Sequence, residues 1–214
     1  MIPRDHSRDH RHHRFPILIV VAVAALVLVL VAAPAAAGPR DHADGFFLRL
    51  AAGMGGAKSS IDLPDGSMEI SGAAADVNIA IGGMVAPNFA VHGTLFGWTA
   101  AEPDVDFMGE SATLDGDVTA AGFGVGATWY FMPANVYVSG SVGIGSLEVD
   151  FGNAKGETDN GPLLDLSVGK EWWVGDKWGL GVGAGVQYHR FPDGDVDENW
   201  SGATYCLRFT ATMN

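Results

Sequence analysis

The stretch KWGLGVGAGVQYHRF, from Lys177 to Phe191, alternates between two kinds of side chain. One set is apolar, and the other is mostly glycine and ends in Gln187 and His189. Because successive side chains of a β-strand point to opposite faces, this period of two predicts one long strand. A glycine face would solvate a sheet poorly in water. The pattern therefore favours a narrow barrel with glycines inside and apolar side chains facing lipid.

The same alternation recurs along the chain. It predicts eight strands, at about 45–55, 70–84, 89–100, 118–131, 136–148, 162–174, 177–191 and 200–212. Bacterial membrane barrels contain an even number of strands, and closure leaves no unpaired strand edge in hydrocarbon. We therefore expect an all-β protein whose residues 45–214 form an eight-stranded antiparallel up-and-down transmembrane β-barrel.

The connections alternate between short and long. Tight turns with Pro, Gly, Asn or Asp are predicted at 85–88, 132–135 and 175–176, and longer loops at 56–69, 101–117, 148–161 and 192–199. Outer-membrane barrels have short periplasmic turns and longer external loops. Both termini of the barrel are thus expected in the periplasm. The four long loops hold 17 acidic residues, so the external surface should be strongly anionic.

Residues 1–37 have the pattern of a helical signal peptide. Four arginines precede the apolar run Ile17–Val31, and Ala35, Ala36 and Ala37 supply small residues for cleavage before Gly38. An uncleaved membrane anchor is the alternative interpretation, because about twenty apolar residues would span a bilayer. Residues 38–44 then form a short N-terminal segment before the barrel.

Charge and cysteine content exclude some functions. The chain has 12 basic and 25 acidic residues, for a net charge of −13, which argues against nucleic-acid binding. Cys206 is the only cysteine, so no intramolecular disulfide can form.

The tryptophans fall near predicted strand ends. Amphipathic rings favour the membrane–water interface, where they form girdles around membrane barrels. We therefore predict an aromatic girdle formed by Trp98, Trp129, Trp172, Trp178 and Trp200.

Several polar residues fall on the predicted inward faces. They are Arg49, Asp76, Asp165, Glu171, Gln187, His189 and Arg208. Unpaired charges in a narrow interior are costly, so our hypothesis is a buried ion network in which Arg49 and Arg208 share Glu171. Asp76 and Asp165 are expected in the outer half of the lumen. The network would plug the barrel; weak pairing through trapped water is the alternative.

The chain shows no catalytic, cofactor or metal motif. His189 is the only inward histidine near the outer rim, and a structural role is favoured for it; His42 and His92 are isolated. The run Asp193–Glu198 is acidic but lacks the glycine and distal glutamate of a calcium-binding EF-hand. A solvated loop is favoured there over a weak divalent-cation site that bridges to lipopolysaccharide phosphates.

The hairpin Gly169–Tyr188 and the run Gly124–Phe131 resemble the bacterial outer-membrane-protein β-barrel domain family, the small OmpA-, OmpX- and OmpW-like barrels. The resemblance is one of pattern over most of 45–214. It implies an outer-membrane location, contact with lipid and lipopolysaccharide, and assembly by the outer-membrane insertion machinery. It implies no catalytic activity.

These observations favour a structural or surface-interaction protein of the outer membrane that is not an enzyme. A narrow pore for small or hydrophobic solutes is one alternative, and it requires an open lumen. A soluble lipocalin-like binding barrel is another, and it requires the apolar faces to point inward.

Overall fold

The described part of the chain is a barrel of β-strands. A computed structural model describes residues 41–42, 45–150, 155–194, 196 and 198–214. The predicted signal peptide and its cleavage site lie outside these residues. Within the described ranges, no helix is long and apolar enough to cross a bilayer.

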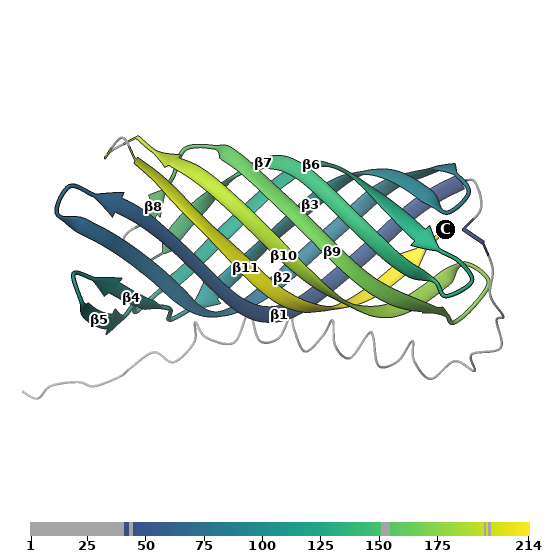
Figure 1. Cartoon of the computed structure of the whole chain (residues 1–214), viewed down its shortest axis with the longest axis horizontal. Helices are drawn as coiled ribbons and strands as arrows, with labels where there is room; N and C mark the ends of the chain where they lie inside the picture. The colour runs from purple at the N-terminus through teal and green to yellow at the C-terminus, as the bar shows by residue number, and fades with distance from the viewer. Residues whose placement is uncertain (1–40, 43–44, 151–154, 195, 197) are drawn as a thin grey trace, which may run out of the picture. The chain divides into compact units, whose positions relative to one another are not determined.

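One antiparallel sheet wraps around and closes on itself (Figure 1). The strands are β1 Gly45–Leu63, β2 Gly66–Ala86, β3 Phe89–Ala101, β4 Asp104–Phe107, β5 Glu110–Thr113, β6 Asp117–Phe131, β7 Val136–Asp150, β8 Lys155–Glu157, β9 Gly161–Trp173, β10 Trp178–Asp193 and β11 Glu198–Met213. The closed order is β1-β11-β10-β9-β7-β6-β3-β2, and β2 pairs back with β1. The eight long strands confirm the predicted eight-stranded barrel.

The long connections differ from the prediction, because they are largely paired strands. The ladder between β1 and β2 continues to the pair Leu63 and Gly66, so the predicted loop 56–69 is a tight hairpin. The predicted loop 101–117 contains the β4–β5 hairpin. Backbone pairing does not require an apolar outward face, so strands continue beyond the lipid, where the sequence alternation that marked them fades.

The predicted tight turns are present at the opposite end of the barrel. Asn88 and Asn135 adopt positive φ values of 62° and 52°, a conformation that asparagine tolerates in turns. The last residue belongs to this end, because the Asn214 amide donates to the Lys177 carbonyl in the third turn. Figure 1 shows the C-terminus opposite β4, β5 and β8.

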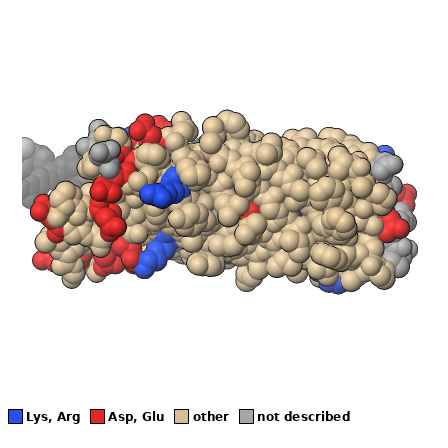
Figure 2. Space-filling model, turned by 45° about the horizontal axis from the view of Figure 1, so that its top comes forward, with Lys and Arg blue, Asp and Glu red and all other residues tan. Residues whose placement is uncertain are grey.

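The outside of the barrel carries an apolar belt. Large apolar side chains such as Phe123, Val125 and Leu207 are 59%, 64% and 71% exposed, while their neighbours in sequence face inward. On the face drawn in Figure 2, acidic groups gather at one end and few charges interrupt the wide band next to it. The soluble alternative required the apolar faces to point inward, and it is wrong for that reason.

The inward glycines make room for close contacts. A Cβ atom added at Gly124 would lie 2.1 Å from the Val142 carbonyl oxygen on β7. A Cβ atom at Gly169 would lie 2.6 Å from ring atoms of Tyr137. These contacts agree with the expectation that glycine relieves crowding in a narrow, strongly curved barrel.

Candidate functional site

The lumen is the main candidate site, because the polar side chains of the barrel converge there. All seven residues predicted to face inward are buried: Arg49, Asp76, Asp165, Glu171, Gln187, His189 and Arg208. They come from strands β1, β2, β9, β10 and β11 on different sides of the barrel. The period-two assignment therefore identified the lumen residues correctly, and the contacts among them define the site.

Arg208 is the centre of the lumen. Its Nε and Nη2 atoms donate to the Asp76 carboxylate at 2.5 and 2.8 Å, and its Nη1 and Nη2 atoms donate to the Asp165 carboxylate at 3.1 and 2.5 Å. Gln187 Nε2 also donates to Asp76, at 2.5 Å, and Asn78 Nδ2 donates to Asp165, at 3.2 Å. One planar guanidinium thus joins β11 to β2 and β9 through two-point hydrogen bonds. We call these five residues the Arg208 centre.

The Arg208 centre corrects the expected partner of Arg208. Instead of bonding Arg208, Glu171 accepts hydrogen bonds from Thr210 at 3.2 Å and Thr212 at 2.7 Å. Arg49 Nη2 donates to Ser139 at 2.6 Å, and its guanidinium lies 4.8 Å from the centre of the Tyr137 ring. Arg49 Nη1 and Glu171 Oε2 have no hydrogen-bond partner among the described residues. A direct link between Arg49 and Glu171 stays a prediction.

The stagger of the strands explains this correction. Residue counts from the strand ends place Asp76 in the outer half of the lumen and Arg208 near the periplasmic end. In the sheet, however, Gly53 pairs with both Asp76 and Arg208, so the two charged residues lie in one row of the ladder. Strands in a barrel are tilted and offset. The register, which the sequence does not state, decides which lumen side chains meet.

An apolar cluster fills the outer half of the lumen. Its buried members include Ile61, Trp98, Leu147, Leu163, Phe191 and Trp200. His189 stacks on Phe191, with ring centres 4.9 Å apart, and its Nε2 atom lies 2.9 Å from Ser59 Oγ. Sequence reasoning missed Ser59 because it fell in a predicted loop. The Ser59–His189 pair lies fully buried among apolar groups.

The predicted aromatic girdle is only partly correct. Trp129 and Trp172 are 52% and 50% exposed on the outer surface, and Trp178 is half-buried. Trp98 and Trp200 instead belong to the apolar cluster in the lumen, at 3% and 6% exposure. The prediction used proximity to strand ends and ignored the phase of the alternation. Trp98 shares the phase of the inward residues Thr94 and Phe96.

His42 closes the other end of the lumen. Its ring stacks on Tyr130 at 3.7 Å, and its Nε2 and Nδ1 atoms lie 2.8 and 3.0 Å from the side-chain oxygens of Asn135 and Asn214. Its backbone N–H donates to the side-chain oxygen of Asn88, and its backbone carbonyl accepts from the Asn88 N–H. Burial lowers the pKa of His42, because it removes water from the imidazolium. No strand pattern surrounds His42 in the sequence, and its position was not anticipated.

The external end is rich in carboxylates, and some of them are paired. Lys155 on β8 lies 2.8 Å from both Glu148 and Asp150 on β7. Hydrogen bonds to these carboxylates raise the pKa of Lys155, which stays charged. Among the residues that the structure describes, no group of three His, Cys, Asp or Glu side chains is arranged to hold a metal ion.

Comparison with known proteins supports the fold. No protein-family model matches the sequence, and no curated protein does. Neisserial surface protein A (NspA) has a similar structure, with a TM-score of 0.54 at 15% identity over 80% of this chain and 99% of that chain.

Two further solved structures align less well. Ail of Yersinia pestis, in complex with the heparin analogue sucrose octasulfate, has a TM-score of 0.43 at 14% sequence identity, over 78% of this chain and 98% of that chain. The outer membrane protein OprG from Pseudomonas aeruginosa has a TM-score of 0.44 at 11% sequence identity, over 77% of this chain and 94% of that chain. The similarity to NspA shows a small closed barrel.

Proposed function

We propose that this chain, an eight-stranded outer-membrane barrel by its fold and its apolar belt, has a structural or surface-interaction role. The observation that carries the proposal is a lumen filled along its length, together with an acidic external end. A filled lumen leaves the external surface as the part of the barrel that can meet soluble molecules outside the cell.

Three layers of side chains support a closed lumen. The apolar cluster fills the outer half, the Arg208 centre crosses the middle, and His42 with Tyr130 fills the periplasmic end. Each layer joins side chains from several strands, so opening a path requires the loss of packing or of buried ion pairs. This arrangement disfavours the narrow-pore alternative.

Electrical recording tests the closed lumen. Purified barrel reconstituted into planar bilayers should give no stable conductance steps, because the three layers of side chains would block a continuous water path. A shift in gel mobility between boiled and unboiled samples serves as the control that the protein is folded. Regular unitary steps from folded protein would contradict the closed lumen and favour a narrow pore.

Two cations mark the outer border of the apolar belt. Lys58 on β1 and Arg190 on β10 are both exposed, and one strand, β11, lies between them. Lys58 also lies 2.7 Å from Glu69 on β2, an exposed ion pair that is weak enough to be exchanged for a phosphate. Each stands about twelve residues beyond the first outward residue of its strand, roughly the length that crosses a bilayer in a tilted strand. This position favours contact with lipopolysaccharide phosphates. The acidic groups beyond it would bind those phosphates through divalent cations.

Co-purification tests the lipopolysaccharide contact. The double substitution Lys58→Gln with Arg190→Gln should lower the retained lipopolysaccharide by at least roughly fivefold, since each cation near an anionic surface contributes about 1 kcal/mol. Lys155→Gln is the matched control, because two carboxylates, Glu148 and Asp150, neutralise that lysine, whereas Lys58 is paired with one, Glu69. Chelation of divalent cations should reduce retention further. Equal retention by the double variant and the wild type would exclude this contact.

A further inference from the structure

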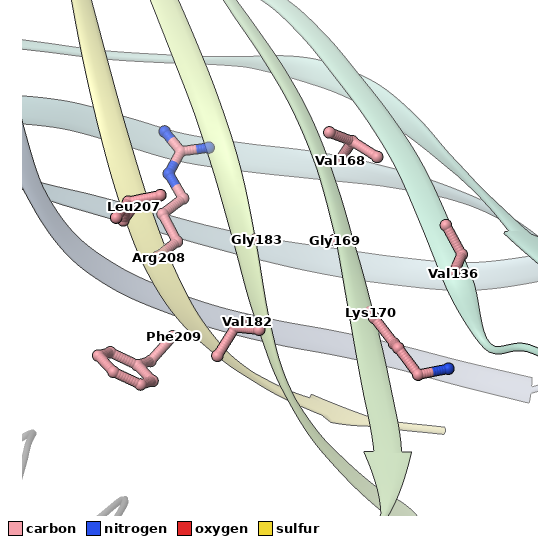
Figure 3. Close-up of a pocket in the computed structure, with 9 residues that line it drawn as sticks. All are labelled: Val136, Val168, Gly169, Lys170, Val182, Gly183, Leu207, Arg208 and Phe209. Carbon is pink, nitrogen blue, oxygen red and sulfur yellow. The ribbon is translucent and has the colours of Figure 1, made fainter.

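The lipid-facing wall of the barrel contains a groove that the lumen does not explain. It crosses β7, β9, β10 and β11 and has a volume of about 570 Å³, within the range of pockets that hold one small ligand. Figure 3 shows its lining, formed by Val136, Val168, Gly169, Lys170, Val182, Gly183, Leu207, Arg208 and Phe209.

The groove follows from the distribution of small residues. Gly169 and Gly183 pair with each other and form its floor, while the Arg208 side chain points away into the lumen. Ala184 is paired with both Val168 and Leu207, so a small residue separates two large outward side chains. The next row places Val182 between Lys170 and Phe209. The hollow is therefore built into the register of three strands.

Lys170 gives the groove one charged end. It is two residues from Trp172, the last outward residue of β9, and its Nζ atom donates to the Ala134 carbonyl oxygen in the turn between β6 and β7. The same ammonium lies 5.6 Å from the centre of the Trp172 ring. No carboxylate is paired with Lys170 within the described ranges. Its positive charge is therefore available at the periplasmic border of the lipid-facing surface.

We propose that this groove binds one anionic phospholipid of the periplasmic leaflet, with an acyl chain along the apolar lining and the phosphate at Lys170. The orientation follows from the position of the charge, because a lipid of the outer leaflet would carry its phosphate at the opposite end of the barrel. An acyl chain in the groove only replaces the acyl chains of other lipids that would contact the same surface. Selectivity for one lipid therefore comes from the shape of the groove and from the charge of the headgroup. The proposal goes beyond the proposed function and rests only on its membrane location.

Native mass spectrometry of the full barrel tests the site. Protein released from nanodiscs with equal amounts of phosphatidylglycerol and phosphatidylcholine should retain phosphatidylglycerol preferentially, by roughly fivefold for one lysine at the headgroup. Lys170→Gln should abolish this preference. Ala184→Leu, which places a larger lipid-facing side chain between Val168 and Leu207 of the lining, should reduce the retention of both lipids.

Lys177→Gln is the matched control. Lys177 is an exposed cation in the next turn at the same end and does not line the groove, so this variant should behave as wild type. Loss of the preference in Lys177→Gln, its persistence in Lys170→Gln, or unchanged retention in Ala184→Leu would each overturn the proposal. A barrel that fails to enter nanodiscs would contradict the membrane location instead, so the two failures are distinguishable.

Discussion

Replacement of Arg208 by methionine should lower the free energy of unfolding by about 3–5 kcal/mol, the usual cost of removing one partner from a buried ion pair. The substitution leaves the carboxylates of Asp76 and Asp165, both 1% exposed, without their shared cation. Urea unfolding in lipid vesicles, followed by the gel shift between folded and unfolded forms, measures the change.

Two further variants identify the cause of that loss. Arg208→Met combined with Asp76→Asn and Asp165→Asn removes all three charges, and it should recover much of the lost stability because no buried charge stays unpaired. Arg190→Met removes an exposed arginine from the outer surface and should have little effect on unfolding. Wild-type stability in Arg208→Met would show that the Arg208 centre does not stabilise the barrel.

Substitution of Gly169 by alanine should destabilise the barrel by about 1–3 kcal/mol, the usual range for an overpacked interior. The added methyl would lie 2.6 Å from the Cε1, Cζ and Oη atoms of Tyr137, which is 1% exposed and cannot move into solvent. The same unfolding measurement reports the effect.

A double-mutant cycle assigns this cost to one contact. In a Tyr137→Ala background the ring is absent, so Gly169→Ala should cost almost nothing there. Gly156→Ala is the matched control, because no atom lies within 4 Å of a Cβ atom at that position. An equal cost of Gly169→Ala in both backgrounds would locate the strain elsewhere, in the backbone conformation of β9.

The strands and the faces of the barrel could be predicted well. In β10, the alternation from Trp178 to Arg190 marks both the strand and the direction of each side chain, because the pleat of a strand repeats every two residues. The ends of β1 and β2 could not be predicted in this way. Their outer portions are stabilised by backbone pairing, and the outward side chains beyond the lipid carry no apolar signal.

The candidate site was predicted only in its composition. The sequence indicated that Arg208, Asp76 and Asp165 face the lumen, and the structure confirms their burial. The sequence could not indicate that Arg208 donates hydrogen bonds to both aspartates, or that Glu171 accepts its hydrogen bonds from Thr210 and Thr212. Side-chain partners across a barrel depend on the stagger between strands, and the sequence states no register.

The tryptophans show the same division. Strand ends predicted that Trp129 and Trp172 lie at the membrane interface, and both are exposed on the outer surface of the barrel. Trp98 and Trp200 also lie near strand ends but pack inside the lumen with Phe191. Distance along a strand sets depth, whereas the phase of the alternation sets the face.

By itself, the sequence determined the eight long strands, the apolar belt, the polar residues of the lumen and the acidic external end, because each follows from a local pattern of side chains. Only the tertiary structure decided that Arg208 meets Asp76 and Asp165, that His42 fills the periplasmic end, and that the small residues of β9 and β10 form a groove beside Lys170. These contacts join residues far apart in the chain. They are set by the closure and stagger of the sheet, which arise from all eight long strands together.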